Sequence, residues 1–138
     1  MNIFVAASYS SKVNYETGEV FPEYKDELEG HLTKLESFGH NVFCALRADH
    51  YKINDADPAQ AFQLDLDEIK KSDGMFAIVD NKVSAGMQTE IGIAIGLEKR
   101  IVLARKAVDT FAYFNDAIIR SGKAEEIVLP IKSDPFLH

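Results

Sequence analysis

A strand–helix–strand unit is clearest in the stretch GMFAIVDNKVSAGMQTEIGIAIGLEKRIVLAR, residues 74–105. Its two ends, residues 74–80 and 100–105, are short apolar runs of the length and composition typical of strands. Between them, residues 86–98 are apolar nearly all round, which predicts a buried helix. A strand, a helix and a second strand in this order are typical of a parallel sheet covered by helices.

The same alternation runs through the rest of the chain. Strands are predicted at residues 2–7, 41–46 and 126–131, and helices at residues 22–38, 57–71 and 109–121. Pro58 after Asp57 is typical of a helix start, and Gly39 and Gly122 are typical of helix ends. We therefore predict one α/β domain over residues 1–138, a flavodoxin-like (Rossmann-like), doubly wound sheet of five parallel strands with helices on both faces.

The composition argues against several classes of function. Lys and Arg total 15 against 22 Asp and Glu, so the net charge is −7, which is the opposite of a protein that binds nucleic-acid polymers. The four histidines lack a metal-ligand spacing, and the single cysteine, Cys44, has no partner for an internal disulfide, so neither a metal nor a disulfide is expected. Without a basic leader or an apolar run of membrane length, the chain is expected to be soluble and cytoplasmic.

Ligands of doubly wound sheets bind beyond the carboxyl ends of the strands, where the strand order reverses. That point is expected between the first and third strands, which makes the loops at residues 8–19 and 80–86 the important ones. Ser84 and Gly86 are either an ordinary helix cap with a loop glycine or groups that present a hydroxyl and N–H donors to one phosphate.

Two carboxylates are candidates for catalysis. Glu90 lies in or near the first turn of the helix at 86–98, where the helix dipole favours a negative charge, so we expect it to stay ionised. An ionised carboxylate there is suited to attack an oxocarbenium-like sugar carbon, although an ordinary surface glutamate fits the same pattern. Asp65 is expected to point toward the cleft, where burial would raise its pKa and let it protonate a departing nucleobase.

Other residues in these segments receive structural interpretations. Gly92 and Gly96 are expected to pack closely against a neighbouring backbone, because each glycine weakens a helix interior. Caps, turns and solvated faces are the preferred interpretation for five aspartates: Asp49, Asp55, Asp57, Asp67 and Asp73.

The pattern DLxxIxxSD at residues 65–73, followed by an apolar strand and SxGxxxEIGxA at residues 84–94, resembles the nucleoside 2-deoxyribosyltransferase family. That family is related to the 2′-deoxynucleoside 5′-monophosphate N-hydrolases. The resemblance extends to residues 3–8 and 100–103. It implies that Glu90 is a nucleophile that forms a glycosyl ester, that Asp65 handles the proton of the departing base, and that Tyr9 or Ser8 lies near Glu90.

The resemblance also implies that no metal or organic cofactor takes part. It implies a homodimer or a higher homo-oligomer in which a neighbouring subunit helps to complete the pocket. Phe111, Tyr113 and Phe114 are candidates for that contact, and they would serve equally well as core residues.

One position departs from the transferase pattern. Typical transferases carry an aspartate that binds a sugar hydroxyl six residues before the glutamate, whereas this chain has Ser84, as the N-hydrolases do. A hydroxyl at a helix start suits a 5′-phosphate, which an aspartate would repel. Further phosphate contacts are expected from Ser8 or Ser10 with Lys12 or Arg47. Asp80 at the strand end leaves open a sugar-binding arrangement with a free nucleoside.

The sequence thus predicts an enzyme that cleaves the N-glycosidic bond of a 2′-deoxynucleoside or its 5′-monophosphate and transfers the sugar to another base or to water. Its partner would be a small nucleoside or nucleotide, without a nucleic-acid polymer or a membrane. The alternatives are an NAD-type glycohydrolase and a non-catalytic, flavodoxin-like nucleotide-binding module. A phospho-receiver is excluded because residues 6–8 supply no acidic pair at the end of the first strand.

Overall fold

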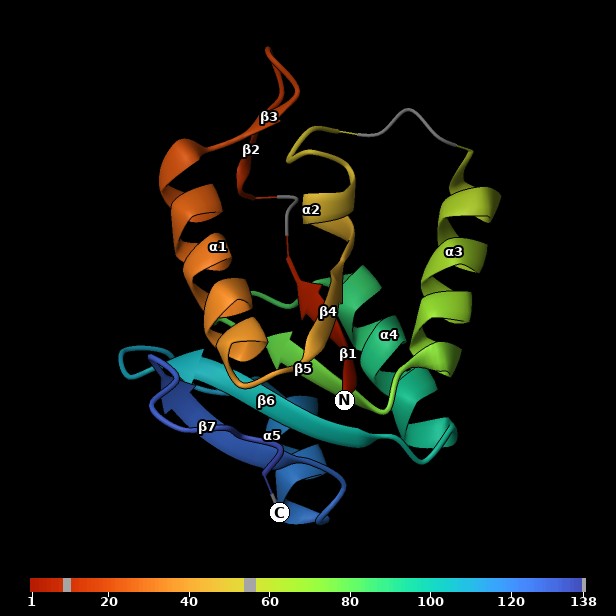
Figure 1. The fold of residues 1–138 in the computed structure, drawn as a ribbon, viewed down its shortest axis with the longest axis vertical. Helices are drawn as coiled ribbons and strands as arrows, with labels where there is room; N and C mark the ends of the chain where they lie inside the picture. Colours follow the sequence, from red (N-terminus) through yellow and green to blue (C-terminus); the bar gives the residue numbers. More distant parts are fainter. Residues whose placement is uncertain (9–10, 54–56, 138) are drawn as a thin grey trace.

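The computed structural model describes residues 1–8, 11–53 and 57–137. Within these residues, five parallel strands form one sheet in the order β4–β1–β5–β6–β7 (Figure 1). This is the flavodoxin-like order that the sequence predicts, with the reversal between β1 and β5. The strands are β1 (Asn2–Ala7), β4 (Asn41–Cys44), β5 (Gly74–Ile78), β6 (Arg100–Lys106) and β7 (Glu125–Leu129).

The centre of the sheet is buried on both faces, as expected for parallel strands covered by helices. Val5 of β1 pairs with Cys44 of β4 and with Phe76 of β5, and all three side chains are buried. This register brings the carboxyl ends of β4, β1 and β5 to one edge of the sheet, where the loops that follow them lie.

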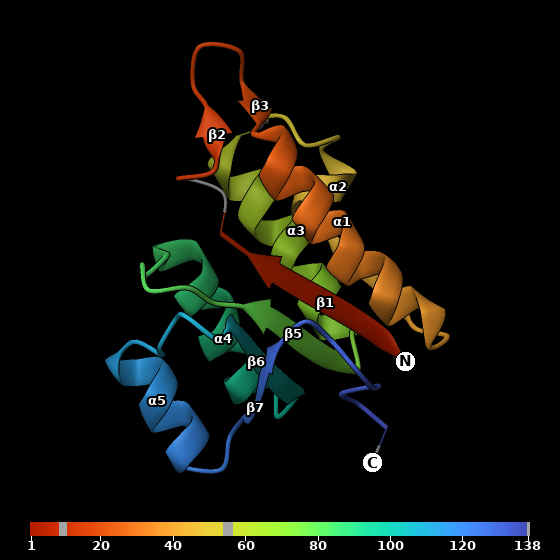
Figure 2. The ribbon, with the colours of Figure 1, turned by 90° about the vertical axis from the view of Figure 1, so that its left-hand side faces the viewer.

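Helices cover both faces of the sheet (Figure 2). On one face, Leu28, Leu32 and Leu35 of α1 (Pro22–Ser37) belong to the core cluster of Val5 and Phe76. The opposite face is covered by α3 (Pro58–Lys71), α4 (Ala85–Gly96) and α5 (Tyr113–Arg120), each of which adds apolar side chains to a second core cluster.

The structure differs from the prediction in three places. A small hairpin of β2 (Val13–Asn14) and β3 (Glu19–Val20) occupies the long connection between β1 and α1. A one-turn helix, α2 (Ala45–Ala48), follows β4, so the strand ends at Cys44. The last helix begins at Tyr113 rather than at residue 109, because Arg105 and Asn81 bind the backbone of Asp109 and Thr110.

The prediction that the helix at residues 86–98 is buried is only half right. Met87, Ile91 and Ala94 of α4 are buried against the sheet. Gly92 and Gly96 face outward, and a Cβ atom built on either one would meet nothing within 4 Å. The expected close backbone packing at these glycines is therefore wrong for the single chain, and α4 keeps an exposed apolar side.

The C-terminal segment packs at the amino ends of the strands, at the end of the sheet opposite the loops that follow β4, β1 and β5. The Phe136 ring packs on Gly74, where an added Cβ would come within 2.9 Å of it. Arg100 donates to the carbonyl oxygens of Pro135 and Phe136, and His40 contacts Asp134 at 2.8 Å.

Candidate active site

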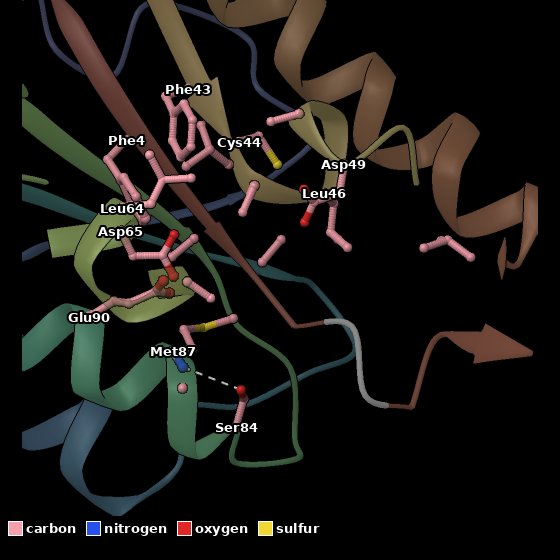
Figure 3. A pocket seen from close by; sticks show the side chains of 18 of the residues that line it. Phe4, Phe43, Cys44, Leu46, Asp49, Leu64, Asp65, Ser84, Met87 and Glu90 are labelled. Atoms are coloured by element: carbon pink, nitrogen blue, oxygen red, sulfur yellow. Dashed lines mark hydrogen bonds between the residues drawn. The ribbon is translucent and has the colours of Figure 1, made fainter. Parts of the chain in front are cut away.

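A cavity of about 410 Å³ opens at the carboxyl ends of β4 and β1, between α2, α3 and α4 (Figure 3). Its walls are largely apolar, so the few polar side chains that reach it are conspicuous. The apolar lining includes Phe4, Phe43, Leu46, Leu64 and Met87, and the polar lining includes Asp49, Lys52, Gln60, Asp65, Ser84 and Glu90.

Asp65 and Glu90 meet in this cavity. Asp65 comes from α3 and Glu90 from α4, two helices that pack against each other. Their carboxyl groups lie beside each other (Figure 3), close enough for each to shift the pKa of the other. The structure thus brings together the two carboxylates that the sequence proposed for catalysis, and it places Asp65 at the cleft as expected.

The environment of the pair shifts the pKa of both carboxyls upward. Burial is the larger cause for Glu90, and the Asp65 carboxylate adds to it, which raises the pKa of Glu90 to about 8. Burial also raises the pKa of Asp65, against the opposing effect of its hydrogen bond to Glu90. Two close carboxyls in an apolar pocket cannot both ionise cheaply, so the pair holds one proton near neutral pH.

The expectation that Glu90 simply stays ionised is therefore wrong. Glu90 is the sixth residue of α4, which begins at Ala85, so it lies in the second turn rather than the first. The helix dipole weakens beyond the first turn, whereas the cost of burying a charge remains. Proximity to Asp65, which belongs to another helix, is the part that no local pattern reveals.

Ser84 is the N-cap of α4. Its hydroxyl oxygen accepts a hydrogen bond from the backbone N–H of Met87 at 3.3 Å, so the cap interpretation is confirmed. Ser84 and Gly86 both line the cavity. Because a hydroxyl accepts and donates at once, the Ser84 proton is still able to point toward a ligand.

Ser8 and Asp80 line a second cavity, of about 350 Å³, rather than the one that holds Glu90. This cavity includes Tyr24 and Glu27 of α1, so it lies on the α1 side of the sheet. The Tyr24 hydroxyl donates to the Ser8 carbonyl oxygen at 2.6 Å.

Lys12 and Arg47, which the sequence suggested for a substrate phosphate, are also away from the cavity of Glu90. Lys12 lies in the second cavity, 3.9 Å from Asp80. Arg47 lines neither of these cavities, because it is paired with Glu29 and Glu36 of α1. Tyr9 and Ser10 lie outside the described residues.

The comparisons with known proteins identify the family of the chain. Residues 17–126 match the sequence family described as Nucleoside 2-deoxyribosyltransferase. The chain belongs to this family. Membership supports nucleoside deoxyribosyltransferase or N-glycosidase activity, and the matched range includes Asp65, Ser84 and Glu90. A search of the curated proteins finds no match.

Three solved structures share the fold of this nucleoside 2-deoxyribosyltransferase family chain. The Clostridium botulinum CMP N-glycosidase BcmB has 24% identity and a TM-score of 0.67, with 94% of this chain and 88% of that chain covered. BlsM has 23% identity and a TM-score of 0.72, with coverage of 93% and 80%. The 2-deoxyribosyltransferase from Bacillus psychrosaccharolyticus has 20% identity and a TM-score of 0.58, with coverage of 94% and 100%.

Asp49 is the residue of this family member that the sequence interpretation missed. It was assigned to caps and turns, and it does end α2, but its side chain also lines the cavity. The signal was its place shortly after the second strand, at the edge where ligands bind. Asp67 is exposed and accepts from Gln63, as expected for a solvated face, and Asp55 lies outside the described residues.

Within residues 1–8, 11–53 and 57–137, no group of three or more His, Cys, Asp or Glu side chains is arranged to hold a metal ion. None of the helices in that part of the chain is long and apolar enough to cross a membrane.

Proposed function

We propose that this chain cleaves the N-glycosidic bond of a 2′-deoxynucleoside or its 5′-monophosphate and passes the deoxyribosyl group, through an ester on Glu90, to another nucleobase or to water. The observation that carries the proposal is the pair of Asp65 and Glu90, side by side in a largely apolar cavity of nucleoside size. One proton shared by two carboxyls supplies both an acid and a nucleophile.

In the first step the shared proton moves from Glu90, which holds it at rest, to Asp65, and this leaves Glu90 ionised. The Glu90 carboxylate attacks the anomeric carbon while the bond from that carbon to the base nitrogen breaks. The bonding electron pair goes to the base, which takes the proton of Asp65. The apolar walls keep water from weakening these electrostatic interactions.

In the second step the glycosyl ester on Glu90 is broken. A water molecule or a second base attacks the anomeric carbon, and Asp65, now a carboxylate, takes a proton from the attacking group. The bond between the sugar carbon and the Glu90 oxygen breaks, and the electron pair returns to Glu90. The pair again holds one proton, so no outside acid or base is consumed.

The start of α4 suits a 5′-phosphate. Ser84 and Gly86 line the cavity at this helix terminus, where the dipole and the backbone N–H groups favour an anion. The Ser84 hydroxyl donates to a phosphate oxygen in this arrangement. Ser8 and Asp80 line the second cavity. They contact the substrate only if it extends beyond the end of β1.

The first experiment is chromatography of the base released from deoxynucleosides and their 5′-monophosphates, with and without a second free base. Base release without an acceptor identifies a hydrolase, and a new nucleoside that forms only with the acceptor identifies a transferase. No release and no exchange from any substrate contradicts the proposal.

The covalent step is tested with Glu90→Gln. We expect this variant to fold and to lose turnover by several orders of magnitude, because it lacks the nucleophile. Mass spectrometry of the intact native enzyme, incubated with a 2′-fluorinated analogue, should show a glycosyl adduct. A proteolytic digest should place that adduct on the peptide that contains Glu90. An adduct elsewhere, or near-normal turnover by a folded Glu90→Gln variant, removes the mechanism.

The phosphate role is tested with Ser84→Asp. Aspartate is as good an N-cap as serine, so α4 should keep its stability, while the added charge repels a phosphate. We expect kcat/KM to fall far more for 5′-monophosphates than for free nucleosides. An equal loss for both would mean that Ser84 is only a helix cap.

We also propose that the working form is a homodimer or a higher homo-oligomer in the cytoplasm. Tyr113 and Phe114 of α5 are 83% and 70% exposed, so they are available for a contact with a second copy, whereas Phe111 is half-buried against the core. Cys44 is a free, buried thiol, which suits a reducing compartment.

A further inference from the structure

Two loops separate the cavity that holds Glu90, here the catalytic cavity, from the second cavity on the α1 side of the sheet. In the loop after β1, Ala7 lines the catalytic cavity and its neighbour Ser8 lines the second one. In the loop after β5, Asp80 lines the second cavity and Ser84 lines the catalytic one. The placement of these two loops therefore shapes the catalytic cavity at the start of α4.

Tyr24 of α1 holds the loop after β1 from the side of the second cavity. Its hydroxyl donates to the Ser8 carbonyl oxygen at 2.6 Å. The backbone N–H of Phe21, the N-cap of α1, donates to the Lys12 carbonyl oxygen at 2.9 Å. The start of α1 thus binds this loop at Ser8 and again at Lys12.

The Tyr24 hydroxyl is a lasting donor. Burial is the larger cause that raises the pKa of Tyr24 well above its ordinary range, and the nearby acidic groups of Cys44 and Asp80 add to it. A phenol that keeps its proton also keeps its hydrogen bond to a carbonyl oxygen. The anchor at Ser8 is therefore present at neutral and at mildly alkaline pH.

Lys12 joins this loop to the loop after β5. Its Nζ atom lies 5.4 Å from the centroid of the Tyr24 ring and 3.9 Å from Oδ2 of Asp80. The other carboxylate oxygen of Asp80 accepts from the backbone N–H of Lys82 at 2.8 Å, which fixes the carboxylate in its own loop. Ion pairs that are about one third exposed contribute little, so the hydrogen bond from Tyr24 to Ser8 is the stronger part of the link.

We infer that Tyr24 is a positioning residue, which holds the loop after β1 and, through Lys12, the loop after β5 in the arrangement that binds the substrate. Tyr24 belongs to the second cavity, and α1 covers the face of the sheet opposite α3 and α4 (Figure 2), so it acts through the loops. Asp65 and Glu90 lie outside this link. The inference rests on the proposed N-glycosidic activity, and it adds a residue that controls substrate affinity.

Tyr24→Phe removes the hydroxyl and keeps the ring beside Lys12. We expect KM for the preferred deoxynucleoside or 5′-monophosphate to rise about three- to tenfold, the range expected for one lost hydrogen bond, because the substrate must then order the loops. The kcat should change by less than about twofold, since the carboxyl pair is untouched. Steady-state rates of base release measure both constants. An unchanged KM, or a fall in kcat at constant KM, refutes the inference.

Thr33→Val is the matched control on the same helix. The Thr33 hydroxyl donates to the Glu29 carbonyl oxygen at 2.8 Å on the exposed side of α1, so this variant also loses a hydrogen bond from a hydroxyl to a backbone carbonyl. It should keep the native KM. An equal rise of KM in both variants would mean that KM follows the stability of α1, which overturns the positioning role.

Lys12→Met breaks the link at its other contact, and it is the second variant if Tyr24→Phe does not fold. Methionine keeps an unbranched chain without the charge, and KM should rise about two- to threefold, as expected for a partly exposed ion pair. Amide hydrogen exchange of the peptide that covers residues 79–84 should be faster in both variants than in the native protein. A raised KM without faster exchange would place the effect on the substrate rather than on the loop, and it contradicts the inference.

Binding separates this inference from the proposed function. Calorimetry in the Glu90→Gln background measures Kd for deoxynucleosides and their 5′-monophosphates without turnover. Adding Tyr24→Phe should raise Kd about three- to tenfold. That result supports the inference even if no base is ever released, in which case the proposed activity fails alone. Turnover by the native enzyme with an unchanged Kd in Tyr24→Phe refutes the inference and leaves the activity standing.

Discussion

Asp65 and Glu90 form the chemically active unit at the scale of single residues, because one proton must serve both groups. If both carboxyls are protonated the nucleophile is lost, and if both are ionised the acid is lost. The reaction therefore requires the singly protonated pair. Burial and mutual repulsion widen the pH range over which that state exists.

We expect kcat/KM to follow a bell-shaped pH profile. In Asp65→Asn the alkaline limb should disappear, because an amide cannot lose a proton in this range, and kcat should fall about 10²- to 10⁴-fold. Initial rates of base release across pH 4–10 measure this, with Asp67→Asn as the control. A full bell in Asp65→Asn would assign the acid to another group.

The raised pKa of Glu90 has a consequence for stability. In the unfolded chain a glutamate titrates near 4.5, and in the fold Glu90 keeps its proton to about pH 8. Between these values the native state binds more protons, so the free energy of unfolding falls as pH rises. We expect Glu90→Gln to raise Tm little at pH 5 and increasingly toward pH 9, as measured by thermal denaturation. A Tm difference that is independent of pH would contradict this.

At the scale of elements, α2 and the turn after it form one wall of the pocket, and Arg47 fastens that wall to α1. In Arg47→Ala we expect a loss of about 1–2 kcal/mol in the free energy of unfolding. KM should rise about tenfold with a smaller change in kcat, because the wall loosens while Asp65 and Glu90 stay in place. Arg47→Lys should be intermediate, since lysine cannot form bidentate pairs.

Steady-state kinetics and denaturant titration decide this prediction. Arg120→Ala is the matched control, because that arginine pairs with Asp116 on the exposed face of α5. It should change neither KM nor stability appreciably. A fall in kcat at constant KM in Arg47→Ala would instead place Arg47 in the chemical step.

Elements with a clear period or a long apolar run were predictable from sequence. The strands at β1, β5 and β6 and the helix α1 depend on local patterns, and their bounds agree within two residues. The two-residue strands β2 and β3 and the one-turn helix α2 carry no period, so no local pattern could reveal them. β2 and β3 pair with each other, and Arg47 of α2 is bound by Glu29 and Glu36 of α1, so both features depend on contacts between separate parts of the chain.

The candidate site also contains residues that a local pattern predicts and properties that depend on tertiary contacts. Glu90, Asp65 and Ser84 were recognised because each has a fixed place relative to a strand end or a helix start. The charge state of Glu90 and the reach of Asp49 into the cavity depend on how α2, α3 and α4 pack. Packing of separate helices is a property of the folded chain, which a linear pattern does not contain.

At the scale of the whole molecule, the face of the sheet opposite α1, which α4 and α5 cover, carries apolar surface that is exposed to solvent. Tyr113 and Phe114 contact each other edge to face on α5, and α4 presents Gly92 and Gly96 outward. We expect light scattering to show a dimer or a larger assembly, and Phe114→Asp to shift it toward the monomer. Leu137→Asp, at an equally exposed apolar position in the C-terminal segment, should not. A native protein that is monomeric at high concentration would contradict this.

Cys44 gives the molecule a built-in chemical reporter. It is the single thiol of the chain, it ends β4, and it lies 4% exposed at the lining of the cavity. Because burial raises the pKa of the thiol and hides it, a thiol-reactive reagent modifies it only when the pocket wall opens. The labelling rate therefore measures how often the pocket wall opens. If a bound nucleotide slows the labelling, its binding can be titrated without turnover and without an engineered probe.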